Sequence, residues 1–508
     1  MSLAKKAAAG FIWTTAANLG SRFITLVSTF ILTRFLAPEL QGEVNLAVVF
    51  VASVGAATTL GVGQFITANP KEGRDVAFHG SVLLMGAGLI GVAVCLLFAT
   101  SVANWLNVPA MAAYVPGLTV SHILDRMGWM QRSILLRDMR FRTFGMRVAL
   151  GELTYALSSV FFASLGWGGD AIVAGNIARA GVSLLFLLSV TNFRDYLTPH
   201  RLSRAIVGRM LRYGVPITVA GFFHVGATNW DNSFMGWRFG PATVGVYNQA
   251  YRLADLPAST LGDQINDILI PTFARLDDAA ARVRGFLRAT ALLALLVFPL
   301  AAGLSVVAPT LVEVFYPPSY AEVAPFLVVL ASLNMFRAIG NLSGAMLQVV
   351  GRTQVFAFID LLLVVMVLGS MALLAPLGAV ASSVGVGLAF TSSVLLTVRA
   401  LRPEGITLLA TLNAIVRPFF ACVPMVAVVL GVRAVTHALG GPLRLGLEIG
   451  AGVVAFVASA FVIAGPVARD FVQLGRSTLR RRRAKGEVAP PPDSESGPPS
   501  EPLSGRQG

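Results

Sequence analysis

The amino-acid sequence predicts an all-α integral membrane protein of about fourteen transmembrane helices, arranged as two pseudo-symmetric six-helix lobes and two C-terminal helices around a central cavity. Three observations predict this fold. Hydrophobic residues make up 55% of the 508 residues and charged residues only 13%, apolar stretches of membrane-spanning length recur along the chain, and one short phrase occurs twice. A soluble protein of this composition would have too few polar side chains to cover its surface.

The spans follow from length and hydropathy, because a helix needs about 20 mostly apolar residues to cross about 30 Å of hydrocarbon. Between turn signals the chain offers fourteen such stretches, at residues 10–34, 44–68, 79–102, 114–136, 146–165, 170–190, 212–236, 244–273, 286–315, 321–349, 354–375, 377–399, 410–431 and 444–465. The first is predicted to be a retained span, since it is too long for the apolar core of a signal peptide and holds Asn18 and Arg22 in its middle.

Basic residues indicate how the chain is oriented. Lys and Arg collect in alternate connections, and connections of this kind lie on the cytoplasmic side of a membrane. The formal net charge of +14 therefore reflects membrane topology, and no nucleic-acid partner is predicted. With an even number of spans, both termini are predicted to be cytoplasmic.

The repeated phrase is Arg-Phe followed by Pro-x-x-x-Gly-x-x-Asn. It places Pro38, Gly42 and Asn45 each 203 residues before Pro241, Gly245 and Asn248. A second match pairs Arg126 with Arg337 at a shift of 211, and continues as Arg142-Thr143 against Arg352-Thr353 at a shift of 210. Six spans per copy is an even number, so both copies enter the membrane from the same side, as in transporters built from parallel repeats.

The duplication predicts the domain organisation. The N-terminal six-helix lobe takes residues 1–200, the C-terminal lobe residues 201–402, and two additional transmembrane helices residues 403–468. The remaining residues, 469–508, are basic and rich in proline. They have almost nothing to bury, and we expect a disordered cytoplasmic tail.

Three stretches resemble a known family: NWDNSFMGWRFGPATVGVYNQAYRLADLP (229–257), LLRDMRFRTFGMR (135–147) and the first span, GFIWTTAANLGSRFITLVSTFILTRFLAP. They are similar to bacterial Wzx-type lipopolysaccharide and exopolysaccharide flippases of the multidrug/oligosaccharidyl-lipid/polysaccharide exporter superfamily. The resemblance runs from about residue 8 to 400. It implies a multi-pass transporter of the cytoplasmic (inner) membrane, not an enzyme, which moves an undecaprenyl-pyrophosphate-linked oligosaccharide to the periplasmic leaflet by alternating access. The implied partners are this lipid-linked oligosaccharide, membrane lipids, and the polysaccharide polymerase and chain-length machinery.

Polar residues inside the spans supply candidates for the cavity. An Arg at the centre of a membrane helix costs roughly 2.5–3.5 kcal/mol on insertion scales, so such residues often mark a transport pathway. The candidates are Asn18, Arg22, Arg126, Arg252, Asn334, Arg337 and Asn341. Arg126 and Arg337, related by the repeat, are predicted to contact phosphate, because a guanidinium makes paired hydrogen bonds to phosphate oxygens. The alternative is that these arginines reach the headgroups or pair with neighbouring carboxylates.

Two carboxylates, Asp231 and Asp360, are candidates for binding a coupling proton or sodium ion, or for balancing an arginine. No cofactor and no metal site are predicted, because the sequence has no Cys/His ligand spacing and no phosphate-binding glycine loop. Two other functions stay open. An ion-coupled multidrug exporter of the same superfamily would favour an acidic and aromatic cavity, and a membrane glycosyltransferase or polymerase would need longer loops than the sequence provides.

Overall fold

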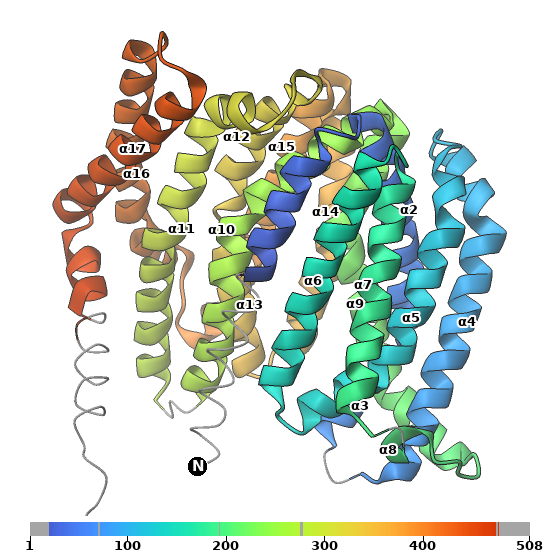
Figure 1. Cartoon of the computed structure of the whole chain (residues 1–508). Coiled ribbons are helices and arrows are strands. Elements are labelled where there is room, and N and C mark those ends of the chain that lie inside the picture. Colours follow the sequence, from blue (N-terminus) through green and yellow to red (C-terminus); the bar gives the residue numbers. More distant parts are fainter. Residues whose placement is uncertain (1–19, 70–71, 193, 275–277, 474–475, 477–508) are drawn as a thin grey trace, which may run out of the picture.

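The computed structural model describes residues 20–69, 72–192, 194–274, 278–473 and 476, and the regular structure of these residues is helical (Figure 1). The first lobe contains a helix over Gly20–Leu32, α2 (Pro38–Ala57), α3 (Val62–Ala68), α4 (Arg74–Trp105), α5 (Met111–Arg137), α6 (Phe141–Ser164), α7 (Asp170–Val190) and the short α8 (Arg194–Leu197). The second contains α9 (Arg204–Phe239), α10 (Pro241–Ala274), α11 (Ala279–Phe315), α12 (Val323–Asn334), α13 (Arg337–Val349), α14 (Thr353–Leu374) and α15 (Ala379–Ala400). The additional hairpin is α16 (Leu408–Val435) and α17 (Gly441–Ile463), and 3₁₀ turns cover Pro318–Tyr320, Ala375–Leu377 and Arg402–Glu404.

The helices agree with the predicted spans. Among the described residues, nine helical segments are long and apolar enough to cross a membrane by length and composition. Together with Gly20–Leu32, α5, α6, α9 and α10, they occupy the fourteen predicted stretches. The beginning of the first stretch lies outside the described residues. Most of the predicted tail does too, although residues 465–473 are helical.

Two predicted spans are each divided into two helices. The first break separates α2 from α3, where Leu60 and Gly61 take left-handed φ angles of 50° and 57° that end the helix. A Cβ on Gly61 would lie 2.4 Å from the Cα of Gly214 on α9, so only glycine allows this approach. The second break lies between α12 and α13, directly before Arg337. The first break lies toward the end of the bundle that carries α3 (Figure 1), and the second lies within the apolar segment Val323–Val349, which is long enough to cross a membrane.

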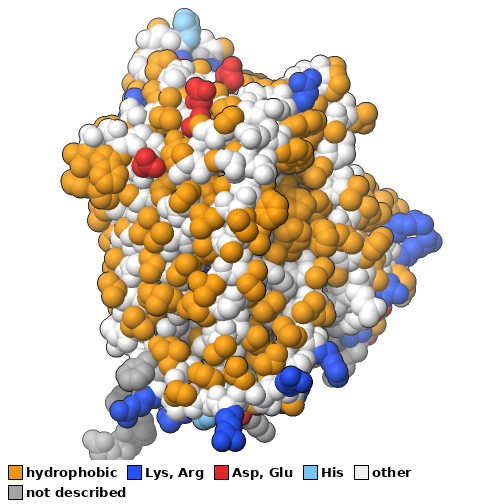
Figure 2. Space-filling model, turned by 90° about the vertical axis from the view of Figure 1, so that its right-hand side faces the viewer, with side chains coloured by type: hydrophobic (Ala, Val, Ile, Leu, Met, Phe, Trp, Pro, Cys, Tyr) orange, Lys and Arg blue, Asp and Glu red, His pale blue; other side chains and the backbone are white. Residues whose placement is uncertain are grey.

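The two ends of the bundle differ in charge. We call the end that carries α3 and α8, at the bottom of Figure 1, the basic face, and the other end the opposite face. In Figure 2, Lys and Arg side chains gather chiefly along the lower rim, whereas the belt above it is hydrophobic. A hydrophobic belt bounded by a basic rim is the surface that a multi-pass membrane protein presents to a bilayer.

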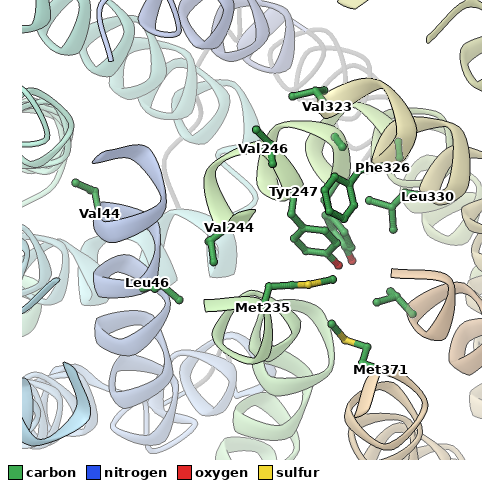
Figure 3. Close-up of a cluster of buried hydrophobic side chains, with 14 of the residues drawn as sticks. Val44, Leu46, Met235, Val244, Val246, Tyr247, Val323, Phe326, Leu330 and Met371 are labelled. Atoms are coloured by element: carbon green, nitrogen blue, oxygen red, sulfur yellow. The ribbon is translucent and has the colours of Figure 1, made fainter. Parts of the chain in front are cut away.

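The buried core joins the two lobes toward the opposite face. In this region Val44 and Leu46 of α2 pack in the same cluster as Met235 of α9, Tyr247 of α10 and Phe326 of α12 (Figure 3). Toward the basic face the core separates into two clusters. One lies around Val62 and Met130 in the first lobe, and the other around Phe286, Phe298 and Leu342 in the second. The first of these clusters also includes Met210 of α9, and Gly61 approaches Gly214 of α9, so α9 packs on the first lobe here, whereas α11, α13 and α15 pack in the separate second cluster.

Candidate functional site

The repeated phrase forms a reciprocal contact between the lobes. Pro38 and Pro241 begin α2 and α10, where the fixed φ of proline suits the first helical turn. A Cβ on Gly42 would lie 1.8 Å from the carbonyl oxygen of Pro241, and one on Gly245 would lie 2.0 Å from that of Pro38. Each glycine therefore lets the backbone of the other lobe approach its helix. The phrase occurs twice because the contact needs one copy from each lobe.

Amide side chains surround this contact. Gln249 donates a hydrogen bond to the side chain of Gln41 across the lobe boundary. The amide nitrogens of Asn45 and Asn248, the asparagines of the two phrases, each donate to Oδ1 of Asn232 at 3.2 Å. These bonds connect α2, α9 and α10, and close the interface between the lobes.

A polar cavity lies beside the contact, and we call it the amide pocket. Its volume is about 170 Å³. Its polar lining residues are Thr25, Thr29, Gln41, Asn45, Glu152, Tyr155, Asn176, Arg179, Asn248, Gln249 and Arg252. Most of these side chains are neutral hydrogen-bonding groups, which are the partners that sugar hydroxyls require.

A larger cavity of about 440 Å³ lies between α2, α5, α6 and α7, and we call it the arginine pocket. Its charged lining residues are Arg126, Arg132, Arg147, Arg179, Asp125 and Glu152. The four guanidiniums exceed the two carboxylates, so the pocket carries a net positive charge. Glu152 and Arg179 line both cavities, and their side chains are 3.5 Å apart. The arginine and amide pockets are therefore neighbours.

The Arg126 side chain is hydrogen-bonded to the C-terminal end of α2, next to the break before α3. Its guanidinium donates to the carbonyl oxygen of Gly55, to Oγ1 of Thr58 at 3.3 Å and to Nε2 of His122 at 3.3 Å. The side chain is only 4% exposed, and its Nη1 has no hydrogen-bond partner among the described residues. Arg126 thus satisfies the Gly55 carbonyl near the end of α2, and its side chain lines the arginine pocket.

Arg337, the repeat-related partner of Arg126, lies in the second lobe at the start of α13. It donates to the hydroxyl of Tyr251 at 2.9 Å and to Oδ1 of Asp255 at 2.8 Å, and it lies 4.7 Å from the ring centre of Phe390. Its charge is therefore balanced within its own lobe. The structure does not place Arg337 beside Arg126 in one cavity lining, since only Arg126 lines the arginine pocket.

The other residues that were predicted to line the cavity lie in different environments. Arg252 is exposed and lines the amide pocket, while Arg22 is half-buried on the first helix. Asn334, at the end of α12, is 1% exposed, and neither of its amide atoms has a partner in the described part of the chain. Asn341 is half-buried on α13. Asn18 lies outside the described residues.

The two candidate carboxylates have different partners. Asp231 is 1% exposed. It accepts hydrogen bonds from the hydroxyl of Tyr247 at 2.6 Å and from the backbone and side-chain nitrogens of Asn232 at 2.9 and 3.1 Å. Asp360 lies 3.5 Å from Nδ1 of His224, in a pair between α14 and α9. The partners of Asp231 belong to the same α9–α10 network as the lobe contact.

Sequence reasoning did not single out Arg132 or Arg147. The basic stretch LLRDMRFRTFGMR was noted for its resemblance to a known family, and Arg147 is the second residue of the predicted span 146–165. In the structure α6 begins at Phe141, so Arg147 lies inside a helix. The missed signal was the spacing of Arg126, Trp129 and Arg132, three residues apart along one helix, which predicts neighbouring side chains.

Comparison with known proteins identifies the family. A model of the family described as "Polysaccharide biosynthesis protein" matches residues 31–325. The chain is 23% identical over 359 residues to the lipopolysaccharide biosynthesis protein WzxC of Escherichia coli, covering 70% of this chain and 72% of that protein. It is 25% identical over 328 residues to the succinoglycan biosynthesis transport protein ExoT of Rhizobium meliloti, covering 63% and 64%.

Solved structures share the fold. The lipid II flippase MurJ in an inward closed conformation has a TM-score of 0.73 at 12% identity, covering 91% of this chain and 100% of that one. An inward-facing multidrug resistance transporter of the MATE family, in the MOP superfamily, has a TM-score of 0.57 at 17% identity, covering 80% and 96%. The predicted all-α, multi-pass membrane fold is confirmed, and the family match spans more than half of the sequence. The chain belongs to the polysaccharide biosynthesis protein family.

Proposed function

We propose that this protein is a flippase that moves an undecaprenyl-pyrophosphate-linked oligosaccharide repeat unit across the inner membrane for lipopolysaccharide or exopolysaccharide synthesis. It is a transporter, and the proposed reaction breaks no covalent bond. Membership of the polysaccharide biosynthesis protein family carries this proposal. The relatives WzxC and ExoT are named for lipopolysaccharide biosynthesis and succinoglycan transport.

The chemistry of the two pockets supports this cargo. A lipid-linked oligosaccharide combines a diphosphate, which needs cationic donors, with sugar hydroxyls, which need neutral hydrogen-bonding groups. The arginine pocket supplies the first and the amide pocket the second, and the two share Glu152 and Arg179. A cationic drug, the cargo in the alternative proposal, would be repelled by four guanidiniums.

The packing of the lobes supports alternating access with the predicted lobes at residues 1–200 and 201–402. The core joins the lobes toward the opposite face, whereas toward the basic face only α9 of the second lobe packs on the first lobe, and α11, α13 and α15 form a separate cluster. If the basic face is cytoplasmic, as the charge bias predicts, cargo enters from the cytoplasm and leaves when the contact between the two phrases opens. Asp231 stays a proposed site for a coupling proton or sodium ion, because it belongs to the network at this contact.

Deleting the gene and identifying the accumulated glycolipid tests the proposal. We expect undecaprenyl-pyrophosphate-linked repeat units to build up in the inner membrane and polysaccharide at the surface to disappear. A plasmid copy should reverse both effects. Normal surface polysaccharide in cells that lack all related flippases would contradict the proposal. Cross-linking in the same cells tests the proposed association with the polymerase and chain-length machinery.

A further inference from the structure

We infer that a groove between α15 and α16 binds one anionic phospholipid of the leaflet at the basic face. The phosphate lies at Arg399 and Arg402, and an acyl chain lies against the leucines deeper in the groove. The occupant is a lipid of the surrounding membrane and is distinct from the cargo. The inference therefore does not depend on which molecule the protein transports.

The groove lies where the additional hairpin meets the second lobe. Its volume is about 520 Å³. Two of its leucines, Leu395 and Leu408, are exposed, so the groove opens on the outer surface of the bundle. It is lined by Leu395, Leu396 and Arg399 of α15, Arg402 of the 3₁₀ turn, and Thr407 and Leu408 next to and at the start of α16.

The height of these residues matches the parts of a phospholipid. Because α14 leads to the opposite face and α15 returns, the turn between α15 and α16 lies at the basic face. Arg399 is in the last turn of α15, where an arginine lies at the level of the headgroups. Leu395 and Leu396 are one helical turn, or about 5 Å, deeper. The groove thus has a charged end at the headgroups and an apolar end at the acyl chains.

The fold holds the backbone that carries the two arginines. Leu401 and Ile406, on either side of the 3₁₀ turn, are each 0% exposed and pack in the core cluster of the second lobe. Between them Gly405 takes a left-handed φ of 86°, which reverses the chain. Nη1 of Arg352 donates to the carbonyl oxygen of Ala400 at 2.6 Å and so caps the end of α15.

The charge of the groove calls for an anion. No carboxylate lines it, and in the described part of the chain neither Arg399 nor Arg402 forms an ion pair. Glu404 belongs to the same 3₁₀ turn but is not part of the lining. A phosphodiester offers two free oxygens, which suit the planar donors of two guanidiniums. Basic pockets between membrane helices on the cytoplasmic side are a recurrent form of anionic lipid site.

The same features select among phosphate compounds. Phosphatidylcholine carries a quaternary ammonium group beside its phosphate, which the two arginines would repel, whereas the glycerol headgroup of phosphatidylglycerol is neutral. A free phosphate ester would leave the leucines of the groove without an apolar partner. The groove therefore favours a lipid with one net negative charge.

Native mass spectrometry tests the site by counting bound lipids. The full-length protein is purified in detergent and titrated with phosphatidylglycerol or with phosphatidylcholine of the same acyl chains. We expect the wild type to retain one phosphatidylglycerol at concentrations at which it retains no phosphatidylcholine. Arg399→Gln/Arg402→Gln should weaken this binding by about tenfold or more, because it removes charge-assisted hydrogen bonds.

A matched variant controls for the general charge of the basic face. Arg209→Gln/Arg284→Gln removes two other arginines, which pair with Glu72 and Asp278, and so changes the net charge by the same amount. This variant should retain phosphatidylglycerol as the wild type does. Equal loss of the lipid by both double variants would mean that the arginines act only through surface charge, and would overturn the site.

Leu408→Glu tests the site without removing an arginine. A glutamate in the first turn of α16 suits the helix dipole, so the fold should be kept, but its charge competes with the phosphate for the two arginines. We expect phosphatidylglycerol to raise the unfolding temperature of the wild type and not that of Leu408→Glu. An equal rise in both proteins would contradict the proposal. So would displacement of the lipid by glycerol 3-phosphate, which has the phosphate without the acyl chains.

Discussion

Glu448 is a buried charge whose partners come from three helices. Glu448 on α17 is 0% exposed. It accepts a hydrogen bond from Thr310 of α11 at 2.8 Å and from Nε of Arg433 on α16 at 3.1 Å. Arg433 also donates to the carbonyl oxygen of Val306. This fully bonded cluster ties the additional hairpin to the second lobe.

Glu448→Gln is expected to lower stability. The change leaves Arg433 and the neighbouring Arg444 without their shared anion, and breaking a buried ion pair by removing one partner costs about 3–5 kcal/mol. Thermal unfolding of the detergent-solubilised protein measures the loss. Glu313→Gln is the control, because the Glu313 side chain is 60% exposed where it meets Arg444, and exposed pairs contribute about 0–1 kcal/mol. Equal unfolding temperatures for the two variants would show that the cluster is not structural.

Arg337→Ala is expected to stop polysaccharide export while the protein stays folded in the membrane, and Arg337→Lys to keep part of it. Both hydrogen bonds come from Nη1, so the ammonium group of lysine can retain the bond to Asp255, but it loses the stacking of the planar guanidinium on Phe390. Export is measured as surface polysaccharide, and protein level by immunoblot of membranes. Normal export by Arg126→Ala/Arg337→Ala in cells without other flippases would refute a role for either arginine in transport.

At the level of helices, the two copies of the repeated phrase bring α2 and α10 into contact. We expect Gly42→Leu and Gly245→Leu each to hold the opposite face open and abolish export, because the added side chain would overlap the facing proline carbonyl. Accessibility is measured on Asn45→Cys with a membrane-impermeant thiol reagent, against a background in which Cys95 and Cys422 are buried. Labelling from outside should increase. Gly86→Leu is the control, since a Cβ there meets nothing within 4 Å.

Over the whole molecule, transport requires the lobes to separate where they now touch. Gln41→Cys with Gln249→Cys replaces two side chains that are hydrogen-bonded across the boundary. A short thiol cross-linker should join these cysteines, stop export and leave the membrane level of the protein unchanged. A cleavable version of the reagent should restore export on reduction, and each single variant should be unaffected. Full export by the cross-linked protein would contradict rocking of the lobes.

Hydropathy located the helices more accurately than their interruptions. The fourteen stretches agree with the helices because length and apolar content are properties of the local sequence. The break before Val62 was not predicted, because the left-handed turn at Leu60 and Gly61 depends on Gly214 of a distant helix. The break before Arg337 lies within the predicted span 321–349, where Asn334 and Arg337 interrupt the apolar sequence but do not by themselves indicate the end of a helix.

The candidate site was predicted in part. The duplication pointed to Arg126, which does line the arginine pocket, and periodicity pointed to Arg252, which lines the amide pocket. Whether an arginine has a partner could not be predicted, because Asp255 and Tyr251 reach Arg337 from another helix. Arg147 was missed because it lies at the start of the predicted span 146–165, where an arginine is expected to reach the headgroups.

The sequence by itself determined that the chain spans a membrane many times, that its two lobes are copies, and that each copy carries the same corner. These three features follow from the amino-acid composition and from the spacing of residues along the chain. Only the tertiary structure decided that the two corners contact each other, that Arg337 pairs with Asp255, and that Arg132 and Arg147 line one pocket with Asp125 and Glu152. The reason is that the energy of a charge in a low-dielectric interior depends on which groups lie within a few ångströms, and those groups come from other helices.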